Sequence, residues 1–74
     1  MLVALWLRRR VDEKRLREAI SARVLLVYGK LCIVDLDVDP EKSLKQQLYE
    51  LRREANRWLG VREGVFRRDF VVLR

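Results

Sequence analysis

The sequence predicts an α+β fold with the element order strand, helix, strand, strand, helix, strand. Three observations favour it: apolar runs near both ends of the chain, two β-branched runs split by Gly29-Lys30, and two segments with a helical apolar period. The length of 74 residues is that of one small domain. We therefore expect a single domain across residues 1–74.

The first two elements are a strand and a short helix. Residues 2–9 form an apolar run that is typical of a strand. Residues 12–22 then place Asp12 and Glu13 at the positive end of a helix of about three turns. Its apolar stripe consists of Leu16, Ala19 and Ile20. This stripe is expected to pack on the sheet.

Two further strands are predicted within residues 23–38. Gly29 stands at the first central position of a two-residue turn, which is the place that a type II′ hairpin requires for glycine. Such a turn pairs residues across the hairpin: Tyr28 with Leu31, Leu26 with Ile33, and Val24 with Asp35.

The start of the second helix is predicted at Asp39-Pro40-Glu41. Asp39 is a good N-cap acceptor, Pro40 loses no hydrogen bond at the first helical position, and Glu41 suits the first turn. The apolar face is expected to hold Leu44, Leu48, Leu51, Ala55 and Trp58. Gly60 would end the helix in a left-handed conformation.

A last strand is predicted over residues 65–73, after a short loop bounded by Gly60 and Gly64. Short chains with this element order favour the ferredoxin-like split βαβ (βαββαβ) fold, a four-stranded antiparallel sheet with two helices on one face. A swapped dimer built from the same elements is the main alternative.

The alternation of side chains divides the sheet into two faces. The face under the helices is expected to hold Val3, Leu5, Leu7, Leu25, Val27, Cys32, Val34, Leu36, Val38, Phe66, Phe70 and Val72, with the reversed assignment of the last strand as the alternative. The open face would hold Ala4, Trp6, Arg8, Val24, Leu26, Tyr28, Leu31, Ile33, Asp35, Asp37, Arg67, Asp69 and Val71. Because a monomer seldom leaves such an apolar centre in water, we expect a homodimer with an interface of Trp6, Leu26, Tyr28, Leu31 and Ile33.

Arginine dominates the charge of the chain. Lys and Arg number 17 against 11 Asp and Glu, which gives a net charge of +6, and 13 of the 17 are Arg. The guanidinium fork binds carboxylates and phosphates bidentately. The expected pairing of the first and last strands would gather Arg8, Arg9, Arg10, Arg67 and Arg68 beside Trp6. This mix predicts nucleic-acid binding, with RNA slightly favoured, and the alternative is a protein-interaction or self-assembly module that uses the apolar open face.

Catalysis is not expected. Without His there is no Ser-His or Cys-His couple, and the three glycines are scattered at turns, so no phosphate loop is formed. Asp35 and Asp37 alternate at a strand end, which leaves a metal-dependent phosphoryl-transfer role as an alternative. We expect no metal and no cofactor.

The remaining composition bears on location and stability. The lone Cys32 lies in an apolar run, so we expect it to be a buried thiol in a protein of the cytoplasm. The apolar start, residues 1–7, is too short to span a membrane. The charged fraction of 38% and the scarcity of Asn and Gln are typical of thermostable proteins.

Two segments resemble strands of known families. Leu5-Trp6-Leu7 resembles the aromatic-centred strand of RNA recognition motif domains, but residues 31–36 lack the paired aromatics that define that family. Residues 65–72 resemble the last strand of the bacterial small-subunit ribosomal protein S-six family, which shares the element order. Each resemblance covers about one strand and implies a fold rather than a function.

Overall fold

The computed structural model describes residues 1–60, 62 and 64–74, so that Val61 and Glu63 of the expected loop lie outside the described residues. The elements are β1 (Leu2–Leu7), α1 (Glu13–Ala19), β2 (Arg23–Tyr28), β3 (Leu31–Asp35), α2 (Leu44–Leu59) and β4 (Phe66–Val72). The predicted order of strands and helices is confirmed. No helix in the described residues is long and apolar enough to cross a membrane.

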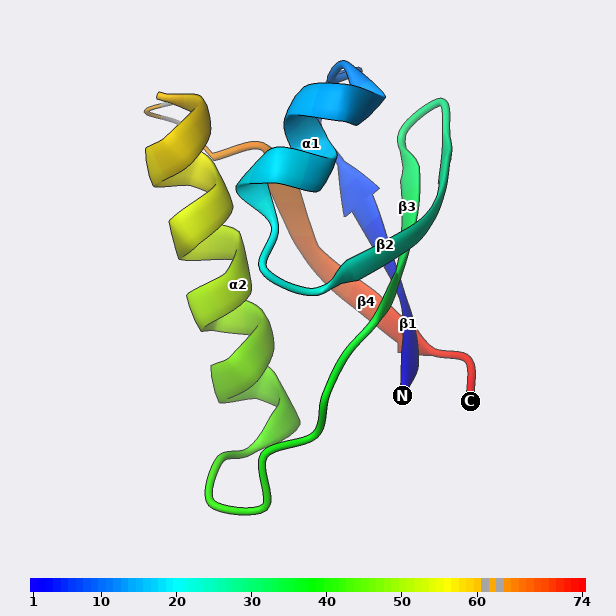
Figure 1. Cartoon of the computed structure of the whole chain (residues 1–74), viewed down its shortest axis with the longest axis vertical. Helices are drawn as coiled ribbons and strands as arrows, with labels where there is room; N and C mark the ends of the chain where they lie inside the picture. Colours follow the sequence, from blue (N-terminus) through cyan, green and yellow to red (C-terminus); the bar gives the residue numbers. More distant parts are fainter. Residues whose placement is uncertain (61, 63) are drawn as a thin grey trace.

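The four strands form one antiparallel sheet in the order β2-β3-β1-β4. β1 lies inside the sheet between β3 and β4, so the first strand of the chain pairs with the last. The two termini therefore lie side by side at one end of the molecule (Figure 1), where the Leu2 amide donates to the Arg74 carbonyl at 3.0 Å. The predicted α+β class with a four-stranded antiparallel sheet and two helices is confirmed.

In the part of the chain that the structure describes, side chains from both helices and from all four strands form one core. Val3, Leu5 and Leu7 of β1 are all buried, as the alternation predicts. The stripe of α1 is also confirmed, although α1 ends at Ala19 because Ile20 is extended and leads the chain toward β2.

The apolar face of α2 differs from the prediction at its last position. Leu48, Leu51 and Ala55 are buried, but Trp58 is 50% exposed. A step of four residues from Ala55 reaches Leu59, and it is Leu59 that packs against the core. Gly60 ends the helix with φ 69°, as expected.

A β-bulge in the hairpin corrects part of the predicted register. Tyr28 pairs with Leu31 and Leu26 with Ile33, but Val24 pairs with Val34 and not with Asp35. Leu25 is the extra residue on β2, so it is exposed while Val24 turns into the core. The predicted faces of these two residues were therefore wrong, because one inserted residue reverses the alternation beyond it.

The last residue of the predicted inward set in this segment, Val38, is exposed as well. β3 ends at Asp35, so strand alternation no longer governs the side chains that follow.

Gly29 has φ 59°, and no described residue other than glycine has positive φ. Those backbone angles agree with the expected type II′ turn, since a type I′ turn would require positive φ at Lys30 too.

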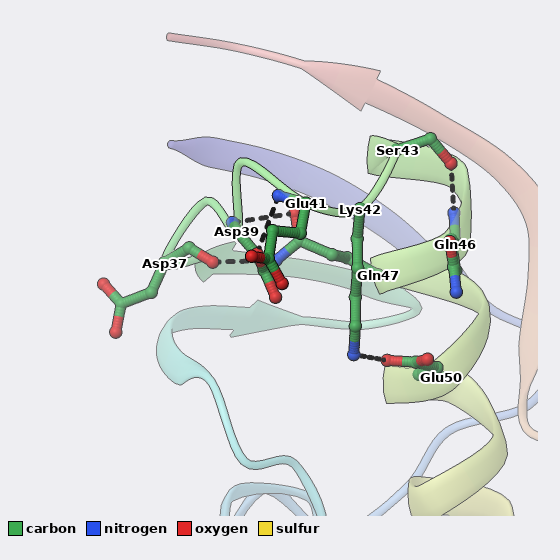
Figure 2. A network of polar contacts seen from close by, with 8 residues as sticks. All are labelled: Asp37, Asp39, Glu41, Lys42, Ser43, Gln46, Gln47 and Glu50. Carbon is green, nitrogen blue, oxygen red and sulfur yellow. Dashed lines mark hydrogen bonds and ion pairs between the residues drawn. The ribbon is translucent and has the colours of Figure 1, made fainter.

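The start of α2 is also corrected. The helix begins at Leu44, and its N-cap is Ser43, whose Oγ accepts a hydrogen bond from the Gln46 amide at 3.1 Å. Asp39 instead caps its own turn: its Oδ1 accepts from the Glu41 amide at 2.9 Å (Figure 2). A serine three residues before a glutamine is itself a good cap pattern, and it lies nearer to the apolar stripe than Asp39 does.

We predict that the two caps differ in their contribution to stability. Ser43→Ala should lower the free energy of unfolding by about 0.5–2 kcal/mol, because it leaves a helix amide without its partner. Asp39→Ala removes a hydrogen bond in an exposed turn and should lower it by less. Urea denaturation measures both variants, and a larger loss in Asp39→Ala would contradict the assignment of Ser43 as the cap.

Cys32 is fully buried in β3, and this burial raises the pKa of its thiol to about 11. The unfolded thiol ionises at lower pH than the folded one, so stability linked to this group is present below the unfolded pKa and is lost as the pH rises toward 11. We predict that Cys32→Ala removes this alkaline loss, as measured by denaturation at pH 8 and pH 10. An unchanged pH dependence would show that Cys32 is not its source.

Candidate nucleic-acid interface

The pairing of β4 with β1 contains a register shift. Leu5 pairs with Phe70 and Leu7 with Phe66, so four residue steps on β4 match two on β1. In a regular antiparallel register Leu7 would face Arg68, whose side chain would then point at the core. The shift lets Phe66 enter the core and leaves the segment 67–69 exposed.

Arg52 of α2 binds the backbone of this exposed segment. Its Nη1 donates to the carbonyl oxygens of Arg67 at 3.3 Å and of Arg68 at 3.0 Å. Partial burial lowers the pKa of Arg52, and the nearby positive charge of Arg68 lowers it further. Arg52 therefore holds the segment in place and adds a second guanidinium beside Arg68.

The end of β1 joins the same region. The Arg8 amide donates to the Val65 carbonyl at 2.7 Å. The Arg8 Nε donates to the Phe66 carbonyl oxygen at 3.4 Å. A hollow of about 440 Å³ is lined by Arg8, Arg67, Arg68 and Asp69. Three of the five arginines that the sequence assigned to phosphate contacts thus meet in one place.

We call this part of the molecule the basic end; it consists of Arg8, Arg9, Arg10, Arg67 and Arg68. Arg9 and Arg10 are exposed in the segment between β1 and α1 but do not line the hollow. Among the residues that the structure describes, the one carboxylate lining the hollow is Asp69, which forms an ion pair with Arg67 at 3.5 Å. Positive charge therefore exceeds negative charge at this end.

The two tryptophans of the chain lie in different settings. Trp6 is half-buried in β1, where its register partner is Leu31. Trp58 is half-exposed at the end of α2, which lies at the same end of the molecule as the turn after β1 (Figure 1). Sequence reasoning missed Trp58 as a surface ring because its spacing from Ala55 also fits the buried helix face.

Sequence reasoning also missed Arg52 as a support for the site. Glu50 and Glu54 stand near it in the sequence, and such alternating charges are typical of a solvated, salt-bridged helix face. The acceptors of Arg52 are the backbone carbonyls of Arg67 and Arg68, which lie in the segment of β4 where the register shifts. No residue pattern in the sequence carries that signal.

The five residues predicted for a dimer interface share one sheet face. Trp6 and Tyr28 both pair with Leu31, and Leu26 pairs with Ile33, so all of them lie on the same side of the sheet. We call this side the open face. Leu26 is 45% exposed and Tyr28 is 77% exposed, so a large apolar surface remains in contact with solvent.

Asp35 and Asp37, the alternating carboxylates of the metal-binding alternative, and the nearby Asp39 lie in different settings. Asp35 pairs with the N-terminal ammonium at 3.2 Å, and the Asp37 carboxylate points away from the surrounding polar network (Figure 2). Within residues 1–60, 62 and 64–74, no group of three His, Cys, Asp or Glu could hold a metal ion. Asp39 is engaged by the Glu41 amide.

A second hollow of about 500 Å³ lies between α2, the residues before β2 and the segment that follows β3. Four carboxylates and three cations line it, among them the ion pair of Lys42 and Glu50 at 2.8 Å. The signs are mixed, so the hollow does not select a phosphate.

Comparisons with protein families, with curated proteins and with solved structures found no match to the chain. The candidate site is consequently defined by its own geometry and charge.

We predict that Arg52→Met destabilises the protein by about 1–2 kcal/mol, because two carbonyl oxygens lose a charged donor. The neighbouring Arg53 is exposed, and no hydrogen bond from its side chain occurs among the described residues. Arg53→Met is therefore the matched control and should change the free energy of unfolding by less than about 0.5 kcal/mol. Equal effects of the two variants in urea would contradict the bracing role of Arg52.

Proposed function

We propose that the chain is a small, non-catalytic nucleic-acid-binding domain whose basic end contacts phosphates, with RNA favoured over DNA. The observation that carries the proposal is the hollow in which Arg8, Arg67 and Arg68 lie together, with Asp69 as the one carboxylate among the described lining residues. Arginine is suited to this role because its planar fork binds phosphate oxygens bidentately and remains charged at all relevant pH values.

The electrostatics of Arg52 support the same proposal. Burial and, to a smaller extent, the positive charge of Arg68 lower the pKa of Arg52, so like charges repel each other at this place. A phosphate bound in the hollow would offset that repulsion. Arg9 and Arg10, on the adjoining segment, would neutralise further phosphates along a strand.

Exposed aromatic rings favour a single-stranded ligand. Tyr28 and Trp6 on the open face, or Trp58 at the end of α2, offer rings on which an unpaired base can stack. Stacking of this kind contributes about 1–3 kcal/mol per base and requires no sequence preference. RNA is favoured on this ground, because unpaired bases are its usual target.

We also propose that the arrangement is the ferredoxin-like split βαβ fold. The strand order β2-β3-β1-β4 and the shared core of both helices support it. A location in the cytoplasm is supported by the buried free thiol of Cys32, and thermostability by the high charged fraction.

A second candidate function is a protein-interaction or self-assembly module. The apolar open face supports it, since Leu26 and Tyr28 remain exposed. The two functions share Tyr28 and Trp6 of the open face, so a protein partner bound there would compete with base stacking on these rings.

We predict that the protein binds single-stranded RNA with a steep dependence on salt. About four phosphate contacts give a slope near −3 in a plot of log affinity against log salt concentration. Replacing Arg8, Arg9 and Arg10 together with Ala should weaken binding and flatten this slope, because fewer counterions are released. Fluorescence anisotropy with a labelled oligonucleotide, at several salt concentrations, measures both quantities.

The matched control removes the same charge elsewhere. Lys45, Arg53 and Arg74 are exposed and lie outside the hollow of Arg8, so their combined replacement with Ala lowers the net charge equally. This control should retain most of the affinity. If both triple variants lose affinity to the same extent, binding reflects net charge alone and the basic end is not the site; if the wild type does not bind, the proposed function is wrong.

A further inference from the structure

The hollow of about 500 Å³ is a groove with an apolar floor. We call it the α2 groove; it is bounded by α2 between Gln47 and Arg57, by Ser21 and Ala22, and by the segment 36–42. Its volume lies in the range of about 300–1,000 Å³ that is typical of ligand pockets. Leu36 and Leu51 expose only 7% and 4% of their surface at its floor, and Ala22 is half-buried. The groove can therefore receive a ligand with a small, apolar middle.

One end of the groove is held in place by Gln47 and is negative. Gln47 Nε2 donates to the Asp37 carbonyl at 2.8 Å, and its Oε1 accepts from the Asp39 amide at 3.3 Å (Figure 2). Lys42 and Glu50 form an ion pair at 2.8 Å across this end, so their charges neutralise each other. Among the described lining residues, the carboxylates of Asp37 and Asp39 then give this end its charge.

The far end of the groove is positive. Arg53 and Arg57 line it, with Glu54 as the carboxylate among the described residues there, and all three side chains are exposed. Because a helix rises about 1.5 Å per residue, Arg53 and Arg57 lie about 9 and 15 Å along α2 from Gln47. The groove thus offers negative charge at one end, positive charge at the other and an apolar floor between them.

We propose that the α2 groove binds an extended peptide segment of a partner protein, with a Lys or Arg next to Asp37 and an Asp or Glu next to Arg53. About three to five extended residues, at about 3.3 Å each, cover the distance of about 9–15 Å between the charged ends. A free amino acid does not fit, because only two bonds of about 1.5 Å separate its ammonium nitrogen from its carboxylate carbon. This binding is independent of whether the basic end binds nucleic acid.

The first test is a titration of isotope-labelled protein, at low salt, with the tetrapeptide Lys-Val-Val-Glu blocked at both termini. Saturable changes in amide chemical shift are expected at Ala22, Leu36 and Leu51. The matched controls are Lys-Val-Val-Lys and Glu-Val-Val-Glu, and each should bind at least about threefold more weakly because one of its ends meets like charge. Equal affinity for the three peptides, or no saturable change at millimolar peptide, would overturn the proposal.

The second test reverses the charge of the far end. Arg53→Glu together with Arg57→Glu makes both ends negative, so the preferred peptide should become Lys-Val-Val-Lys. Lys45→Glu together with Arg74→Glu changes the net charge equally and should keep the preference for Lys-Val-Val-Glu, because neither residue lines the groove. All four positions are exposed, so both variants should fold. A preference that changes in both variants, or in neither, would contradict binding in the α2 groove.

Discussion

The register shift between β1 and β4 is the constraint on which the surface of this protein depends. Without the two additional residues on β4, Arg68 would point at the core opposite Leu7, where a guanidinium has no partner. With them, Phe66 fills that place and the positive charges stay in water. The shift also exposes the two carbonyl oxygens that Arg52 binds, so one local irregularity joins α2, β1 and β4.

Much of the fold follows from the sequence because periodicity determines which face of an element is buried. The alternation in β1 correctly assigns Val3, Leu5 and Leu7 to the core, and the helical step does the same for Leu16 and Leu48. Such patterns are repeated over several residues, so a single exception does not obscure them. The order of the elements and the antiparallel sheet follow from them as well.

The predictions from the sequence were wrong where a single inserted residue changes a strand and where two residues compete as helix caps. The bulge at Leu25 reverses the faces of two residues, and nothing in the apolar run 24–27 shows which residue is the extra one. Ser43 and Asp39 are both good caps, and the choice depends on where the apolar stripe of α2 meets the core. Of the candidate site, the meeting of Arg8 with Arg67 and Arg68 could be expected from strand order, whereas the role of Arg52 could not.

The most direct test is the register of β1 and β4 in solution, measured by nuclear Overhauser contacts across the two strands in isotope-labelled protein. We expect backbone contacts between Leu5 and Phe70 and also between Leu7 and Phe66. Contacts between Leu7 and Arg68 in place of the second pair would show a regular ladder. In that case the exposed arginine segment would not exist as described, and the basic end would lose its structural basis.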